Sequence, residues 1–183
     1  NKKEGMKRRI SEILAGLGML EISNYHLTNK KDQFSKMSIQ EKDFIEVEES
    51  KTDYTILRNN LSHYALKIIS ENVDVEYPQK IFEIGKVFSI KNNKIKEEEM
   101  LSVAITPGNF TEIKQILEFF SKMIDIKLEV KEPSQTLNYL IDGRCGEITL
   151  NEKTIGFIGE IHPKILKNWK IKMPVALFEI SLE

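Results

Sequence analysis

The chain has 183 residues, of which 40% are hydrophobic and 30% are charged, and its formal net charge is −1. This composition indicates a globular domain with a sizeable core, and it excludes a disordered chain and a strongly basic binder of nucleic acid. The single cysteine excludes an internal disulfide and favours a reducing, cytoplasmic compartment. No apolar run approaches the length of a membrane span, so no membrane association is predicted.

The first segment is predicted to form an amphipathic helix. Its apolar residues recur at three- and four-residue spacing, at Met6, Ile10, Ile13, Leu14 and Leu17. The opposite face is basic, and such a face is more often solvated than bound to phosphate. The apolar stripe is either ordinary core or a surface that packs on another subunit, and composition alone favours core. Because the chain begins inside this helix and not with methionine, we expect residues 1–183 to be one domain of a longer protein.

The next segments combine short strands with one helix. Strands are predicted at 20–27 and 44–48, and a polar connection lies between them at 28–37. A helix is predicted over 59–71, because its apolar residues repeat at helical spacing. The residues expected on its buried side are Leu61, Tyr64, Ala65, Ile68 and Ile69.

A β-hairpin and a second amphipathic helix are predicted in the middle of the chain. Strands at 81–90 and 100–106 flank a polar turn at 91–94. The helix follows, with an apolar stripe over 113–124 and with Thr111 or Asn109 as its N-terminal cap. Alternation of apolar residues over 126–130 predicts a further strand.

The C-terminal part reads as strand, tight turn, strand, short helix and strand. Alternation over 147–150 and the return over 154–161 indicate the first two strands. Pro163 suits the first turn of the helix, because it lacks only a hydrogen that would be unpaired there. The last strand is predicted over 175–182. Hairpins mixed with helices, without repeated strand–helix units, predict an α+β fold with an antiparallel sheet flanked by helices.

Residue patterns that would carry chemistry are few. The three histidines, His26, His63 and His162, fall in separate segments without the spacing of metal ligands, so no metal site is predicted. Cys145 lies between Arg144 and Gly146 and is more simply a small strand residue than a nucleophile. The residues alone therefore favour no catalytic site and no bound cofactor.

Five separated motifs, taken together, resemble the phenylalanyl-tRNA synthetase beta subunit family in its archaeal and eukaryotic form. In chain order they are Tyr54-Thr55-Ile56-Leu57-Arg58-Asn59-Asn60-Leu61, Tyr77-Pro78-Gln79-Lys80-Ile81-Phe82-Glu83-Ile84-Gly85, Asn109-Phe110-Thr111-Glu112-Ile113-Lys114, Asp142-Gly143-Arg144 and Gly159-Glu160-Ile161-His162-Pro163. They follow the order of that family and cover nearly the whole chain. The resemblance implies a catalytic-like module with a class II aminoacyl-tRNA synthetase-like core.

The family's known properties then set expectations for partners and cofactors. The resemblance implies an α2β2 ligase in which the alpha subunit binds ATP, phenylalanine and the tRNA acceptor end. ATP and magnesium would serve the whole enzyme, tRNA would be bound through the whole enzyme, and this module would hold no cofactor. Its role would be a scaffold that packs on the alpha subunit. In the class II fold the N-terminal helix lies at the subunit interface, which implies an interface through Met6, Ile10, Ile13 and Leu17.

Two departures from a working class II site predict that this module is inactive. The second class II motif needs an arginine after a strand, and this chain has Ser89 there. The third motif needs an arginine for the γ-phosphate, and this chain has Glu183. Neither side chain can supply the positive fork that binds phosphate. The alternatives are a module that retains adenylate or small-molecule binding, and a module that contacts tRNA.

Overall fold

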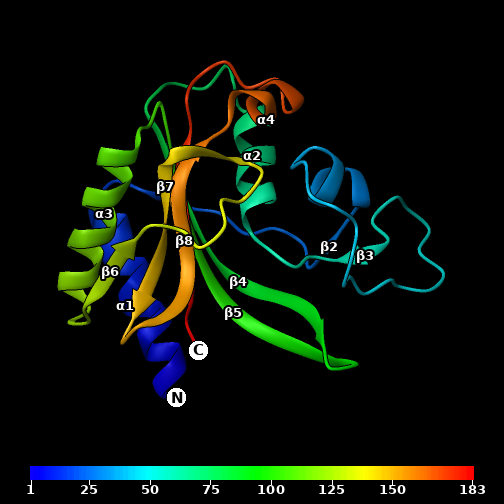
Figure 1. Ribbon diagram of the computed structural model, residues 1–183, viewed down its shortest axis with the longest axis horizontal. Helices are drawn as coiled ribbons and strands as arrows, with labels where there is room; N and C mark the ends of the chain where they lie inside the picture. The colour runs from blue at the N-terminus through cyan, green and yellow to red at the C-terminus, as the bar shows by residue number, and fades with distance from the viewer.

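The computed structural model describes residues 1–183 and forms a seven-stranded sheet with helices on both faces (Figure 1). The strands in order across the sheet are β1 (Leu20–Glu21), β4 (Gln79–Lys91), β5 (Lys94–Thr106), β9 (Ala176–Ser181), β8 (Lys153–Ile161), β7 (Leu140–Leu150) and β6 (Leu128–Lys131). Only β1 and β4 run parallel, and every other neighbouring pair is antiparallel. The predicted α+β class is therefore confirmed, and the last strand joins the sheet of the hairpin through β5.

The two faces of the sheet are covered by different helices. Helices α1 (Lys2–Gly16) and α3 (Phe110–Met123) bury one apolar core, and α2 (Ser62–Glu71) and α4 (Pro163–Asn168) bury the other. Successive strand residues point to opposite faces. On β9, for example, Phe178 enters the core beneath α3, whereas Leu177 enters the core beneath α2. No helix combines the length and the apolar character that crossing a bilayer requires.

The long hairpin is confirmed and extends further than predicted. Strands β4 and β5 pair without interruption from Gln79 opposite Thr106 to Lys91 opposite Lys94. Asn92 and Asn93 turn the chain with φ values of 52° and 60°, which asparagine tolerates in tight hairpin turns. The part of the hairpin near this turn projects from the rest of the sheet, so its side chains are mostly exposed (Figure 1).

Two strand predictions are wrong. Residues 20–27 form not one strand but two, because the chain leaves the large sheet after β1 and joins a small sheet as β2 (Leu27–Thr28). There β2 pairs with β3 (Ile56–Leu57). Residues 44–48 contribute only the isolated bridge between Glu46 and Ile56. Asp43 and Glu49 have φ values of 53° and 56°, and such turn conformations on both sides prevent a longer strand. The predicted connection at 28–37 contains a π-helical turn, η1 (Lys31–Ser35).

The predicted helices form, and their caps explain where they begin. Asn109, one of the two predicted caps, accepts a hydrogen bond from the Glu112 amide at 2.8 Å, so α3 begins at Phe110. Helix α4 begins at Pro163 as predicted, and the His162 ring accepts from the Lys164 amide at 3.1 Å. Helix α2 begins at Ser62, later than predicted, and its first turn donates hydrogen bonds to Glu179 on β9.

Candidate functional site

A buried ion pair lies on the sheet face beneath α2. Arg58, which follows β3, is 1% exposed, and its Nη1 lies 3.1 Å from Glu83 Oε1 on β4. Its Nε donates to the Lys86 carbonyl at 2.8 Å. Gly85 lies directly under the guanidinium, and a Cβ atom there would collide with Arg58 Nη2. A glycine in this strand therefore provides the space into which the arginine folds.

A second buried carboxylate holds the start of α2 on the same face. Glu179 on β9 is 2% exposed, and its Oε1 accepts from the Leu61 amide at 2.9 Å and from Ser62 Oγ at 2.8 Å. Burial raises the pKa of Glu179 to about 7, although both hydrogen bonds and the charge of Arg58 favour the ionised form. The carboxylate thus replaces a local cap and fixes the first turn of the helix to the middle of the sheet.

A third cluster is centred on Glu160 of β8. Its Oε2 accepts from the Phe110 amide at 3.0 Å, which is the first residue of α3. Its Oε1 lies 3.4 Å from Nη1 of Arg144 on β7. Three of the five motifs, those around Asn109, Arg144 and Glu160, therefore meet at one carboxylate. The other two motifs meet at Arg58 and Glu83.

The two positions at which the resemblance calls for arginines, Ser89 and Glu183, lie in different parts of the structure. Ser89 lies opposite Lys96 in the projecting part of the hairpin. Glu183 follows β9, and its Oε1 accepts from Lys3 Nζ at 2.8 Å and from the Glu99 amide at 3.1 Å. The Lys3 ammonium holds the pKa of Glu183 below its usual range. Glu183 therefore acts as a link between the end of the chain and α1.

The histidines and the cysteine have separate places. His63 is fully buried, its Nε2 lies 3.0 Å from Thr28 Oγ1, and burial lowers its pKa to about 3. His162 caps α4, and the His26 ring packs on Phe88 with centroids 5.3 Å apart. The structure contains no group of three or more histidine, cysteine, aspartate or glutamate side chains arranged to hold a metal ion.

The apolar stripe of α1 divides between core and surface. Ile10 is completely buried within this chain, in the core that also contains Leu14, and Ile13 and Leu17 pack partly against that core. Met6 is 40% exposed. The expectation that Ile10 contacts a partner thus needs revision, because α3 and the sheet already cover its side chain. Of the predicted interface residues, Met6 is the one that remains largely open to solvent.

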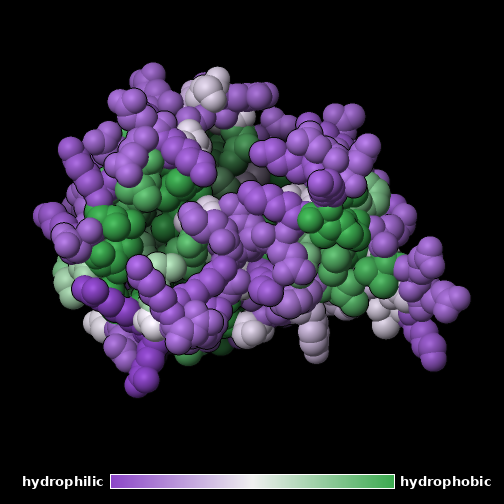
Figure 2. Space-filling view, turned by 90° about the horizontal axis from the view of Figure 1, so that it is seen from below, coloured by the Kyte–Doolittle hydropathy of each residue, from purple (hydrophilic) through white to green (hydrophobic).

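Met6 borders an open groove of about 760 Å³ between α1, the end of α3 and the chain terminus. Ile124, Ile126 and Leu182 supply its other apolar walls, and Lys2, Lys3 and Arg9 line its rim. Phe119 and Met123 of α3 are 44% and 43% exposed nearby. Figure 2 shows this apolar area on the side of α1 and α3, bordered by hydrophilic side chains. The sequence predicted Met6 as an interface residue but did not indicate the groove, because the other walls of the groove come from distant segments.

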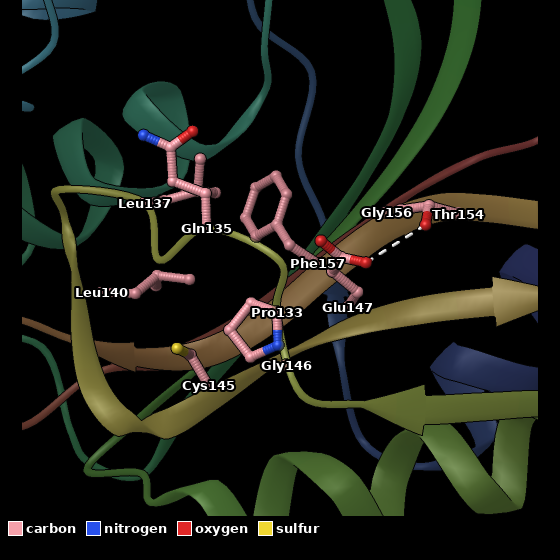
Figure 3. Close-up of a pocket in the computed structure, with 10 residues that line it drawn as sticks. All are labelled: Pro133, Gln135, Leu137, Leu140, Cys145, Gly146, Glu147, Thr154, Gly156 and Phe157. Carbon is pink, nitrogen blue, oxygen red and sulfur yellow. Dashed lines mark hydrogen bonds between the residues drawn. The ribbon is translucent and has the colours of Figure 1, made fainter.

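A smaller cavity, which the sequence did not indicate, lies on the other face of the sheet. It has a volume of about 230 Å³ and is formed by β7, β8 and the loop before β7 (Figure 3). Cys145 lines it, and burial raises the pKa of that thiol. A thiol with a raised pKa is a poor nucleophile at neutral pH.

Comparison with known proteins places this geometry in a family. The model of the phenylalanyl tRNA synthetase beta chain CLM domain matches residues 1–182. The phenylalanine–tRNA ligase beta subunit of Thermococcus sibiricus is 39% identical over 94% of this chain and 32% of its own length. The corresponding subunit of Pyrococcus abyssi is 36% identical over 94% and 32%. That of Archaeoglobus fulgidus is 34% identical over 93% and 31%. The chain spans about a third of the length of these curated relatives.

Proposed function

This chain belongs to the phenylalanyl-tRNA synthetase beta chain family, and we propose that it is a non-catalytic scaffold of the phenylalanine–tRNA ligase complex. In this proposal it has a class II synthetase-like core without a working site, and it packs on the alpha subunit of a cytoplasmic α2β2 enzyme. ATP and magnesium are then used by the partner, and tRNA is bound through the whole assembly.

The observation that carries the non-catalytic role is that the charged groups on this face of the sheet pair with other groups of the same chain. Binding ATP requires accessible cationic side chains that can reach phosphate oxygens. Arg58 is buried and paired with Glu83, and Glu179 places a carboxylate where α2 meets the sheet. Ser89 and Glu183 carry no positive charge. These four positions therefore supply no free positive charge for the phosphates of a nucleotide.

The scaffold role rests on the groove beside Met6. Contiguous exposed apolar surface that is rimmed by polar residues marks sites where protein partners bind. Met6 and Ile126, which line the groove, are 40% and 37% exposed. The groove has an apolar floor, and its rim carries Lys2 and Arg9 beside the ion pair of Lys3 with Glu183, so it fits a partner helix with an apolar face and acidic flanking residues. We assign that helix to the alpha subunit.

Co-purification with the alpha subunit tests this proposal. Met6→Glu places a charge at the groove and should reduce the recovered complex at least tenfold, with little change in the melting temperature of the isolated chain. Ile95→Glu is the matched control, because Ile95 is 65% exposed but lies on the projecting hairpin, and it should leave the complex intact. Wild-type recovery of complex with Met6→Glu would refute the assigned surface. Calorimetric binding of ATP to the isolated chain would refute the non-catalytic role.

A further inference from the structure

The 230 Å³ cavity on β7 and β8 has no part in the scaffold role, yet it has the features of a binding site. Leu140, Cys145 and Phe157 project from the two strands toward one hollow, and Pro133 and Leu137 of the preceding loop lie across from them (Figure 3). A volume of this size is below that of pockets for drug-sized ligands, so it suits a single ring or a branched alkyl group.

The charge at the edge of the cavity limits the chemistry of a ligand. Glu147 is the only charged residue that lines the cavity, and it forms no ion pair. Its Oε1 accepts from the Ser134 amide at 2.9 Å and from Ser134 Oγ at 2.7 Å. Its Oε2 accepts only from Thr154 Oγ1, at 3.2 Å. These bonds lower the pKa of Glu147, so the group is a fixed anion at neutral pH.

We propose that this cavity binds a small primary amine, with its apolar body between Leu140 and Phe157 and its ammonium group at the Glu147 carboxylate. This carboxylate has unused acceptor capacity, since it has about four lone-pair sites and accepts three hydrogen bonds within the chain. A nucleotide or another anion is disfavoured, because no lysine or arginine lines the cavity. A free amino acid is disfavoured for the same reason, since its carboxylate would have no cationic partner.

Cys145 provides a direct measure of occupancy. It is the only cysteine of the chain, and its thiol lies in the cavity. A ligand in the cavity should therefore slow alkylation of the thiol, measured by mass spectrometry at a mildly alkaline pH where some thiolate is present. The reference is the alkylation rate of the protein without a probe. The same reaction with a small model thiol shows whether a probe affects the alkylating reagent itself, and each protein rate is corrected for that effect.

The probes are benzylamine, benzyl alcohol, benzoate and phenylalanine, which share one ring and differ in charge. Benzylamine should protect Cys145 saturably, with at least fivefold tighter half-protection than benzyl alcohol, and benzoate should not protect. Glu147→Gln should abolish the preference for the amine. Glu152→Gln, in the exposed turn between β7 and β8, removes the same charge outside the cavity and should preserve it.

Three results would overturn the proposal. Equal protection by benzylamine and benzyl alcohol would show that Glu147 does not select a cation, and this comparison needs only the wild-type chain. Tighter binding of phenylalanine than of benzylamine would show an amino-acid site instead. A preference for the amine that survives in Glu147→Gln, with the variant's melting curve unchanged, would place the amine elsewhere.

Discussion

Replacing Glu179 by glutamine should make the stability of the domain less dependent on pH. The glutamine Oε1 can accept the same hydrogen bonds from the Leu61 amide and Ser62 Oγ, so the start of α2 keeps its support. The change removes the ability to ionise and replaces the second carboxylate oxygen by an NH2 group, whose effect on stability does not depend on pH. In the wild-type protein, by contrast, this buried carboxyl loses its proton within the accessible pH range.

The sign and size follow from the pKa of the carboxyl. Burial raises the pKa of Glu179 from its ordinary value of 4.5 to about 7, so the folded state binds the proton more tightly than the unfolded state. The stabilising contribution is thus fully present below pH 4.5 and is lost as the pH rises through 7. Each pH unit in that window changes the free energy of unfolding by at most ~1.4 kcal/mol, which gives a total on the order of 3 kcal/mol.

Urea denaturation at pH 5, 6, 7 and 8 provides the measurement. Relative to the wild type, Glu179→Gln should gain on the order of 3 kcal/mol between pH 5 and pH 8. Taking the difference between the two proteins cancels the contribution of other groups, such as His63. The exposed Glu152→Gln variant should follow the wild-type curve at every pH. A difference that stays constant with pH, or that shrinks as pH rises, would show that the carboxyl is ionised in the fold throughout.

Two further pairs of substitutions test the core and the stripe of α1. Gly85→Ala should destabilise the domain by about 3–5 kcal/mol in urea, because the new methyl group displaces the buried Arg58 from its ion pair. Gly5→Ala, in an open position of α1, should instead stabilise it by ~0.5–1 kcal/mol. Ile10→Glu should abolish cooperative thermal unfolding, whereas Met6→Glu should leave it intact, because only Ile10 is completely buried. If the two variants melted alike, the assignment of Ile10 to the core and of Met6 to the surface would be contradicted.

Local sequence signals predicted the elements whose structure depends on near neighbours. The turn at Asn92 and Asn93, the cap at Asn109 and the start of α4 at Pro163 each need only a few adjacent residues. Apolar spacing likewise identified α1, although it did not separate Ile10 from Met6. Both fit the same stripe, and the difference depends on how far α3 extends along α1.

Features that depend on distant partners were not predictable from the pattern. The segment after β1 leaves the sheet at the point where the Asn24 amide donates to the side chain of Glu83 on β4, at 2.7 Å. Nothing within 20–27 indicates this interruption. The small cavity is equally non-local, since Pro133 and Phe157 come from separate segments. The burial of Arg58 also escaped prediction, because an arginine is almost never buried unless it is paired, and its partner lies 25 residues away.

The structure gives a physical reason why the separated motifs occur together. Arg58 needs both the carboxylate of Glu83 and the space above Gly85, which lie in another motif. Loss of any one leaves a buried charge unpaired or creates a collision, and either costs several kcal/mol. Glu160 joins the remaining motifs through hydrogen bonds to the start of α3 and to Arg144. Because these charged residues pair with one another, the motifs specify a rigid fold, which suits the proposed scaffold role.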